Sequence, residues 1–163
     1  MIDRAAVRYR KAIEIDTNFT NAHIDLGIAL VAVDRLQEAL PHFKRAVILE
    51  PELPAARYNL AIVLQKAGAG DRAIAHYNWL IGSDPGIVAA HGRSGLTHLA
   101  ANRVLDAIVR LRRVVALEPE HAKGHYPLGL ALGRWDSVSA GRAHRRWASD
   151  LDPGLIGTEE AGF

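Results

Sequence analysis

Residues 20–53 read TNAHIDLGIALVAVDRLQEALPHFKRAVILEPEL, and the pattern of this stretch returns three more times along the chain. Its proline recurs every 34 residues, each time after an aspartate or a glutamate, at Pro51, Pro85, Pro119 and Pro153. Placing this proline at position 32 gives four units, residues 20–53, 54–87, 88–121 and 122–155. Similarity at a fixed period of this length is typical of a repeat protein.

Other columns of the unit indicate a pair of packed helices. Position 8 is small in each unit, as Gly27, Ala61, Gly95 and Gly129, and so is position 20, as Ala39, Ala73, Ala107 and Gly141. Small side chains at a crossing allow two helices to approach closely. Position 15 holds Asp34, Gly68, Asn102 and Asp136, residue types that tolerate the left-handed backbone at the end of a helix. Because proline cannot continue a helix, each unit is expected to be a helix, a turn, a second helix and a stop.

This arrangement of small residues and proline in a 34-residue unit resembles the tetratricopeptide repeat family. The resemblance implies an all-α fold, a right-handed α-solenoid of stacked helix-turn-helix repeats. Residues 1–19 are then expected to form the second helix of an incomplete leading repeat, and residues 156–163 a tail. Residues 122–155 are the atypical last repeat, because Arg145 stands at position 24, where the other units have Phe43, Tyr77 and Leu111. We interpret this arginine as a mark of the end of the stack.

Position 4 departs from the family, which often has a large aromatic or aliphatic residue there. In this chain it holds His23, Arg57, His91 and His125. The sequence offers no reason for the change.

The resemblance also implies a binding surface, because the first helices of this family line a concave face. The partner-binding residues expected on that face are Ile24, Ile28, Tyr58, Asn59, Ile62, Gln65, Arg93, Leu96, Leu99, Tyr126 and Leu130. Most of them are apolar, which favours an apolar or helical peptide segment of a partner protein as the ligand. The alternative is that these side chains bury one another. Family members that grip a C-terminal carboxylate use five polar slots, of which only two match here, Asn59 and Arg93.

We find no recognisable catalytic apparatus in the sequence, and we expect no enzyme activity, no cofactor and no metal site. Six of the eight histidines occupy two positions of the unit, position 4 in His23, His91 and His125 and position 23 in His42, His76 and His144. Equivalent histidines of successive units lie one repeat apart, which is too far for ligands that each sit ~2 Å from one ion. Ser94 lacks the G-x-S-x-G spacing of a nucleophile elbow. The glycines at 68 and 70 lack the lysine of a phosphate loop.

Composition fits a folded chain and limits the partners. The 163 residues are 49% hydrophobic and 23% charged, with a net charge of +2 and no cysteine, so disulfides are excluded. Residues 103–147 hold nine lysines and arginines against four acidic residues, but interleaved aromatic residues are few. A nucleic-acid partner is therefore disfavoured, whereas an acidic partner or an anionic lipid stays open.

No stretch approaches the ~20 apolar residues of a membrane span, and the N-terminus is too charged for a signal peptide. We therefore expect a cytoplasmic location, and the residue usage suggests a bacterium.

Two other functions remain open at this stage. The leading helix lacks its repeat mate, so its edge around Tyr9 and Ile13 could pair with a second copy of the chain. The same missing half-repeat is consistent with a regulatory or substrate-presenting segment of a larger bacterial enzyme, such as a glycosyltransferase or a sulfotransferase.

Overall fold

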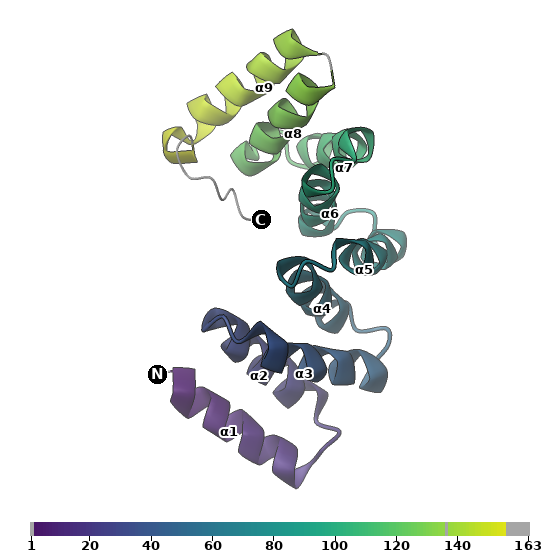
Figure 1. Cartoon of the computed structure of the whole chain (residues 1–163), viewed down its shortest axis with the longest axis vertical. Helices are drawn as coiled ribbons and strands as arrows, with labels where there is room; N and C mark the ends of the chain where they lie inside the picture. The colour runs from purple at the N-terminus through teal and green to yellow at the C-terminus, as the bar shows by residue number, and fades with distance from the viewer. Residues whose placement is uncertain (1, 136, 156–163) are drawn as a thin grey trace. The chain divides into compact units, whose positions relative to one another are not determined.

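The computed structural model describes residues 2–135 and 137–155 (Figure 1). These residues form nine α-helices, a short 3-10 helix and no strand, so the predicted all-α class is confirmed. The helices are α1 (Ile2–Ile15), α2 (Thr20–Ala32), α3 (Leu36–Leu49), α4 (Pro54–Lys66), α5 (Gly70–Ser83), α6 (Val88–Ala100), α7 (Val104–Leu117), α8 (Ala122–Arg134) and α9 (Val138–Leu151), followed by the 3-10 helix η1 (Pro153–Leu155).

The helices follow the 34-residue period without a shift. In each of the four units the first helix occupies positions 1–13 and the second helix positions 17–30. Helix α1 occupies positions 17–30 of the unit that would precede residues 20–53, which are the positions of a second helix. The prolines at position 32 all lie just beyond a second helix, where their missing N–H and fixed φ cost nothing.

In the first three hairpins the turn is a helix stop made by one left-handed residue. Asp34, Gly68 and Asn102 have φ of 58°, 78° and 57°, as their shared position 15 predicted, whereas Asp136 lies outside the described residues. In the first hairpin the N–H of Arg35 donates to the carbonyl of Leu30 at 2.9 Å, and the N–H of Asp34 donates to the carbonyl of Val31 at 3.0 Å. This pair of bonds is the Schellman motif, which satisfies carbonyls that the helix end leaves open.

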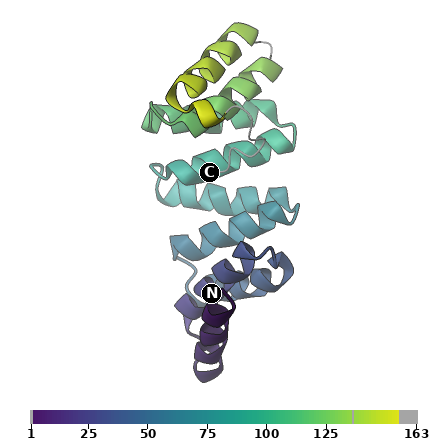
Figure 2. The same ribbon diagram turned by 90° about the vertical axis from the view of Figure 1, so that its left-hand side faces the viewer.

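The chain divides into two compact units, residues 1–76 and 77–163. In the first, α1 packs on α2, α2 on α3 and α3 on α4, and the first helices α2 and α4 also touch. In the second, α6 packs on α7, α7 on α8 and α8 on α9, and the first helices α6 and α8 touch. Figures 1 and 2 show this alternation within each unit from two directions. First helices that touch each other place their equivalent positions on one face of the unit.

The glycines at position 8 receive the position-24 side chain of the same hairpin. A Cβ atom on Gly27 would lie 2.6 Å from the ring of Phe43, and one on Gly95 would lie 2.7 Å from Leu111. Phe43 and Leu111 are fully buried in these contacts. Position 24 therefore packs within its own hairpin in these two units, and the interpretation of Arg145 as a mark of the end of the stack stays a prediction.

Candidate protein-binding surface

The predicted binding residues of the first unit lie on the first helices α2 and α4. Ile28, at the centre of α2, is 46% exposed although its helix is flanked by neighbours. On α4 the side chains of Tyr58, Ile62 and Gln65 are half-buried. Ile28 and Ile62 occupy the same position of successive units, position 9, and their helices are in contact. The unit therefore presents partly uncovered apolar side chains on its first-helix face.

The second unit repeats this arrangement on α6 and α8. Leu96, Tyr126 and Leu130 are half-buried, so each keeps part of its apolar surface open. Leu96 and Leu130 both stand at position 9, as Ile28 and Ile62 do in the first unit.

Two members of the predicted set belong to the packing instead. Ile24 is 7% exposed and Leu99 is 8% exposed, and Leu99 joins the core cluster of α6, α7 and α8 together with Leu111 and Leu128. For these two residues the alternative of mutual burial describes the structure better than an open face, and we leave them out of the contact set proposed below.

The polar members of the set are held by their own helices or already have partners. The amide of Asn59 donates to the carbonyl of Ala55 at 2.8 Å, one turn back on α4. Arg93 is half-buried on α6. Neither arrangement provides the cluster of open cationic side chains that a terminal carboxylate requires.

Position 4, where the chain departs from the family, holds a hydrogen-bond donor in every unit. Each donor reaches the position-32 carbonyl of the turn before it: His23 Nε2 to Thr17 at 3.1 Å, Arg57 Nε to Pro51 at 2.6 Å, His91 Nε2 to Pro85 at 3.1 Å and His125 Nε2 to Pro119 at 2.7 Å. A carbonyl oxygen only accepts, so the Nε2 atom of each of these histidines carries a proton. The bond ties each hairpin to the preceding turn, which an apolar residue at position 4 could not do.

The structure also joins the two rows of histidines that the sequence analysis treated separately. His23 and His42 approach through their Nδ1 atoms at 3.1 Å, and His125 and His144 do so at 2.8 Å. Since the Nε2 atoms of His23 and His125 are the protonated ones, their Nδ1 atoms accept, and the position-23 partner donates. With these protons, each contact between two Nδ1 atoms has one donor and one acceptor.

Burial and the neighbouring ring lower the pKa of the position-23 histidine in each of these two pairs. Burial lowers the pKa of His144 below its ordinary value of 6.5, and the rings and charges of His125 and Arg112 lower it further. The pKa of His42 is lowered in the same way, most strongly by burial and then by the neighbouring His23 and Arg10. Among the described residues no group of three or more histidine, cysteine, aspartate or glutamate side chains could hold a metal ion. The paired histidines link the two helices of a hairpin through a side-chain hydrogen bond.

The remaining motifs take structural places. Ser94 is fully buried in the middle of α6, with no strand before it, so it is not a nucleophile elbow. Gly68 makes the left-handed turn between α4 and α5. Within the described part of the chain no helix is both long enough and apolar enough to cross a bilayer.

Comparisons with known proteins agree with this architecture. Residues 24–86 match the family model of the tetratricopeptide repeat. The chain is 21% identical over 150 residues to anaphase-promoting complex subunit 3 of Schizosaccharomyces pombe, with 92% of this chain covered, and it spans only 23% of the length of that relative. Among solved structures, MamA from residue 41 to its end, of Desulfovibrio magneticus RS-1, has a similar fold.

That MamA structure shares 22% identity, with 95% of this chain and 88% of that chain covered and a TM-score of 0.87. YrrB, described as a TPR protein with an unusual peptide-binding site, has a TM-score of 0.81 at 22% identity, with 94% of this chain and 79% of that chain covered. At this level of identity the structural likeness concerns the fold.

Proposed function

We propose, from the premise that this chain carries tetratricopeptide repeats, that it is a non-enzymatic scaffold whose first helices bind an apolar or amphipathic peptide segment of a partner protein. The proposed contacts on the face of the first unit are Ile28, Tyr58 and Ile62. The second unit has a face of its own, with Leu96, Tyr126 and Leu130 as the proposed contacts. An amphipathic helix laid along such a face places its apolar side chains every three to four residues against it.

The observation that carries the proposal is the incomplete burial of position 9. In a helix that packs against neighbours, a large apolar residue near the centre is usually in the core, yet Ile28 is 46% exposed and Ile62, Leu96 and Leu130 are only half-buried. Covering such side chains on binding contributes about 1 kcal/mol each. YrrB, which has a similar fold and is described as having a peptide-binding site, makes the same role reasonable for this chain.

The test begins with selection of a peptide. A phage-displayed library of random peptides is selected on the full chain, and an enriched peptide is synthesised with a fluorophore and titrated by anisotropy. We expect the pair Tyr58→Ala and Ile62→Ala, or the pair Leu96→Ala and Leu130→Ala, to weaken binding about tenfold or more, since two lost apolar contacts are worth about 2 kcal/mol.

The control truncates apolar side chains that are more exposed than the tested ones and lie on second helices. Ile48→Ala on α3 and Val109→Ala on α7 remove open apolar surface away from the first helices, because these residues are 67% and 64% exposed. Their binding should stay within about twofold of the wild type. The proposal fails if no peptide is enriched, or if both first-helix pairs bind like the controls while their far-UV circular dichroism is unchanged.

Self-association is a second candidate, and the exposure of α1 favours it. Tyr9 and Ile13 are half-buried, but Val7 and Ile15 on the same helix are 59% and 83% exposed. A second copy would cover this apolar surface. Sedimentation velocity should show a concentration-dependent dimer that Val7→Asp abolishes, and a monomer at the highest concentration would exclude it.

A further inference from the structure

The second helices of the second unit, α7 and α9, are strongly cationic. They carry six arginines and two aspartates, namely Arg110, Arg112, Arg113, Arg142, Arg145, Arg146, Asp106 and Asp150. Such a surplus on adjacent hairpins attracts anionic groups.

Four of these arginines are available to a ligand. Arg110 donates to the side-chain oxygen of Asn78 at 2.8 Å, and Arg145 donates to the carbonyl of Gly129 at 3.0 Å. The other four, Arg112, Arg113, Arg142 and Arg146, form no ion pair or hydrogen bond with another described residue. Their charge is therefore uncompensated in the described part of the chain.

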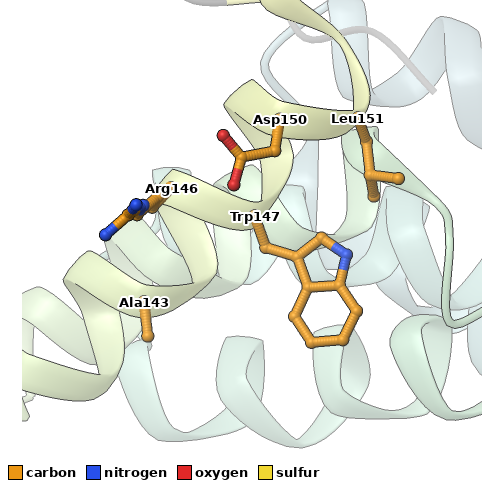
Figure 3. Close-up of a pocket in the computed structure, with 5 residues that line it drawn as sticks. All are labelled: Ala143, Arg146, Trp147, Asp150 and Leu151. Carbon is orange, nitrogen blue, oxygen red and sulfur yellow. The ribbon is translucent and has the colours of Figure 1, made fainter.

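One of them, Arg146, lines a largely apolar hollow on α9. It has a volume of about 360 Å³ and is lined by Ala143, Arg146, Trp147, Asp150 and Leu151. These residues are spaced three and four apart, so they form one face of the helix. Figure 3 shows the indole of Trp147 and the side chain of Leu151 directed to the same side of α9, with Arg146 and Asp150 at the edge. Trp147 is 51% exposed and Leu151 is 38% exposed.

The exposed tryptophan is held in place before any ligand arrives. Its ring stacks on the buried His125, with centroids 4.9 Å apart and an interplanar angle of 10°. His125 is fixed in turn by Pro119 and His144. An aromatic side chain that is already ordered loses little entropy on binding, which makes it a good anchor.

We propose that this α9 surface binds an acidic amphipathic helix of another protein, with an apolar side chain over Trp147 and Leu151 and carboxylates on Arg142 and Arg146. The proposal is separate from the first-helix site, because it uses a second helix and requires acidic side chains in the partner. Arginine suits carboxylates because its planar guanidinium can donate two parallel hydrogen bonds.

The charge pattern favours a polypeptide over a polyphosphate. Asp150 lies within the lining of the hollow, one turn from Arg146, and would repel a phosphate placed near Trp147. A peptide can place a neutral or basic residue there and its carboxylates one turn away. In addition, one face of the indole is covered by His125, which leaves a single face for any stacked base.

The probe is a labelled peptide of about 15 residues, with leucine and phenylalanine on one helical face and glutamate on the other, titrated into the full chain by anisotropy. We expect saturable binding that weakens as salt rises from about 0.05 M to about 0.3 M. Arg142→Glu with Arg146→Glu should weaken it on the order of tenfold or more, and Trp147→Ala severalfold. If Trp147→Ala does not fold, the double arginine variant still tests the proposal, because Arg142 and Arg146 are exposed and their replacement leaves the core unchanged.

The matched control is Arg8→Glu with Arg10→Glu, the same change of charge at exposed sites on α1. It should bind the peptide within about twofold of the wild type. The proposal is overturned if the peptide does not bind, if the control weakens binding as much as the α9 variant, or if a lysine version of the peptide binds equally well. It is also overturned if phosphatidylserine vesicles or oligo(dT) bind in an α9-dependent way and the acidic peptide does not.

Discussion

The glycine at position 20 of the last hairpin provides the sharpest test of the structure. Position 20 is Ala39, Ala73 and Ala107 in the other hairpins, all fully buried. The repeat pattern alone therefore predicts that Gly141→Ala restores the usual residue and gains the roughly 1 kcal/mol by which alanine exceeds glycine in a helix.

The contacts of Gly141 predict the opposite. A Cβ atom there would lie 2.7 Å from the carbonyl oxygen of Gly129 and 2.9 Å from the backbone nitrogen of Gly133. These are backbone atoms, so no side chain can rotate away, and α8 and α9 would have to separate. Moving from 2.7 Å to an ordinary contact of about 3.4 Å requires a shift of about 0.7 Å.

The size of the effect follows from two opposing contributions. Overpacking of this kind costs about 1–3 kcal/mol, and here the upper part of that range applies because the contact is with backbone. The shift would also disturb the bond from Arg145 to the Gly129 carbonyl. After subtraction of the helix gain, we expect Gly141→Ala to lower the free energy of unfolding by about 1–2 kcal/mol.

Urea unfolding followed by circular dichroism measures the total effect. Because repeats can unfold separately, hydrogen exchange of the segment that contains α9 should report the loss locally. The control is Gly82→Ala on α5, where a Cβ atom meets nothing within 4 Å and where we expect a gain of up to about 1 kcal/mol. If Gly141→Ala is as stable as the wild type or more stable, the close approach of α8 and α9 is refuted.

Three further predictions concern single contacts. Gly68→Ala should destabilise by about 1 kcal/mol in urea unfolding because its φ is +78°, whereas Gly68→Asn should be nearly neutral, since Asn102 adopts φ 57° at the same position; equal effects would contradict the turn geometry. His91→Leu should cost about 1 kcal/mol by removing the donor to the Pro85 carbonyl, and a stabilised variant would refute that role. The free energy of unfolding should fall as pH drops below 6.5, because burial and the paired ring lower the pKa of His42 and His144, so that the folded state binds fewer protons than the unfolded state. Comparing urea midpoints at about pH 7.5 and pH 5.5 tests this, and the difference should shrink in a His42→Asn, His144→Asn variant.

Much of the candidate site could be located from the sequence, but its exposure could not. The repeat period placed Ile28, Ile62, Leu96 and Leu130 at one position of four first helices. It could not separate Ile28, which is 46% exposed, from Ile24, which is 7% exposed one turn earlier. Both are isoleucines on the same helix, and burial depends on the angle and distance of the neighbouring helices, which residue type does not encode.

The hydrogen-bonded histidines were missed for a related reason. Position 4 and position 23 are 19 residues apart, and nothing in the sequence states that their side chains meet. The sequence did contain a signal, because two of the units hold a histidine at both position 4 and position 23. These are His23 with His42 and His125 with His144. Every residue at position 4 can donate a hydrogen bond, and the backbone carbonyl at position 32 of the preceding turn needs a donor. Together these two facts indicate a hydrogen bond between the two positions.

The sequence by itself determined the all-α class, the order of helices and turns in each unit and the residues of the left-handed turns, because each depends on local rules. Period, proline and left-handed residues act over one or two turns of chain, and their effects recur in every unit. Only the tertiary structure decided which apolar residues stay open, how closely α8 and α9 approach, and which histidines pair. Those properties arise from the packing of side chains on different helices, where a displacement of less than 1 Å changes a contact into a clash.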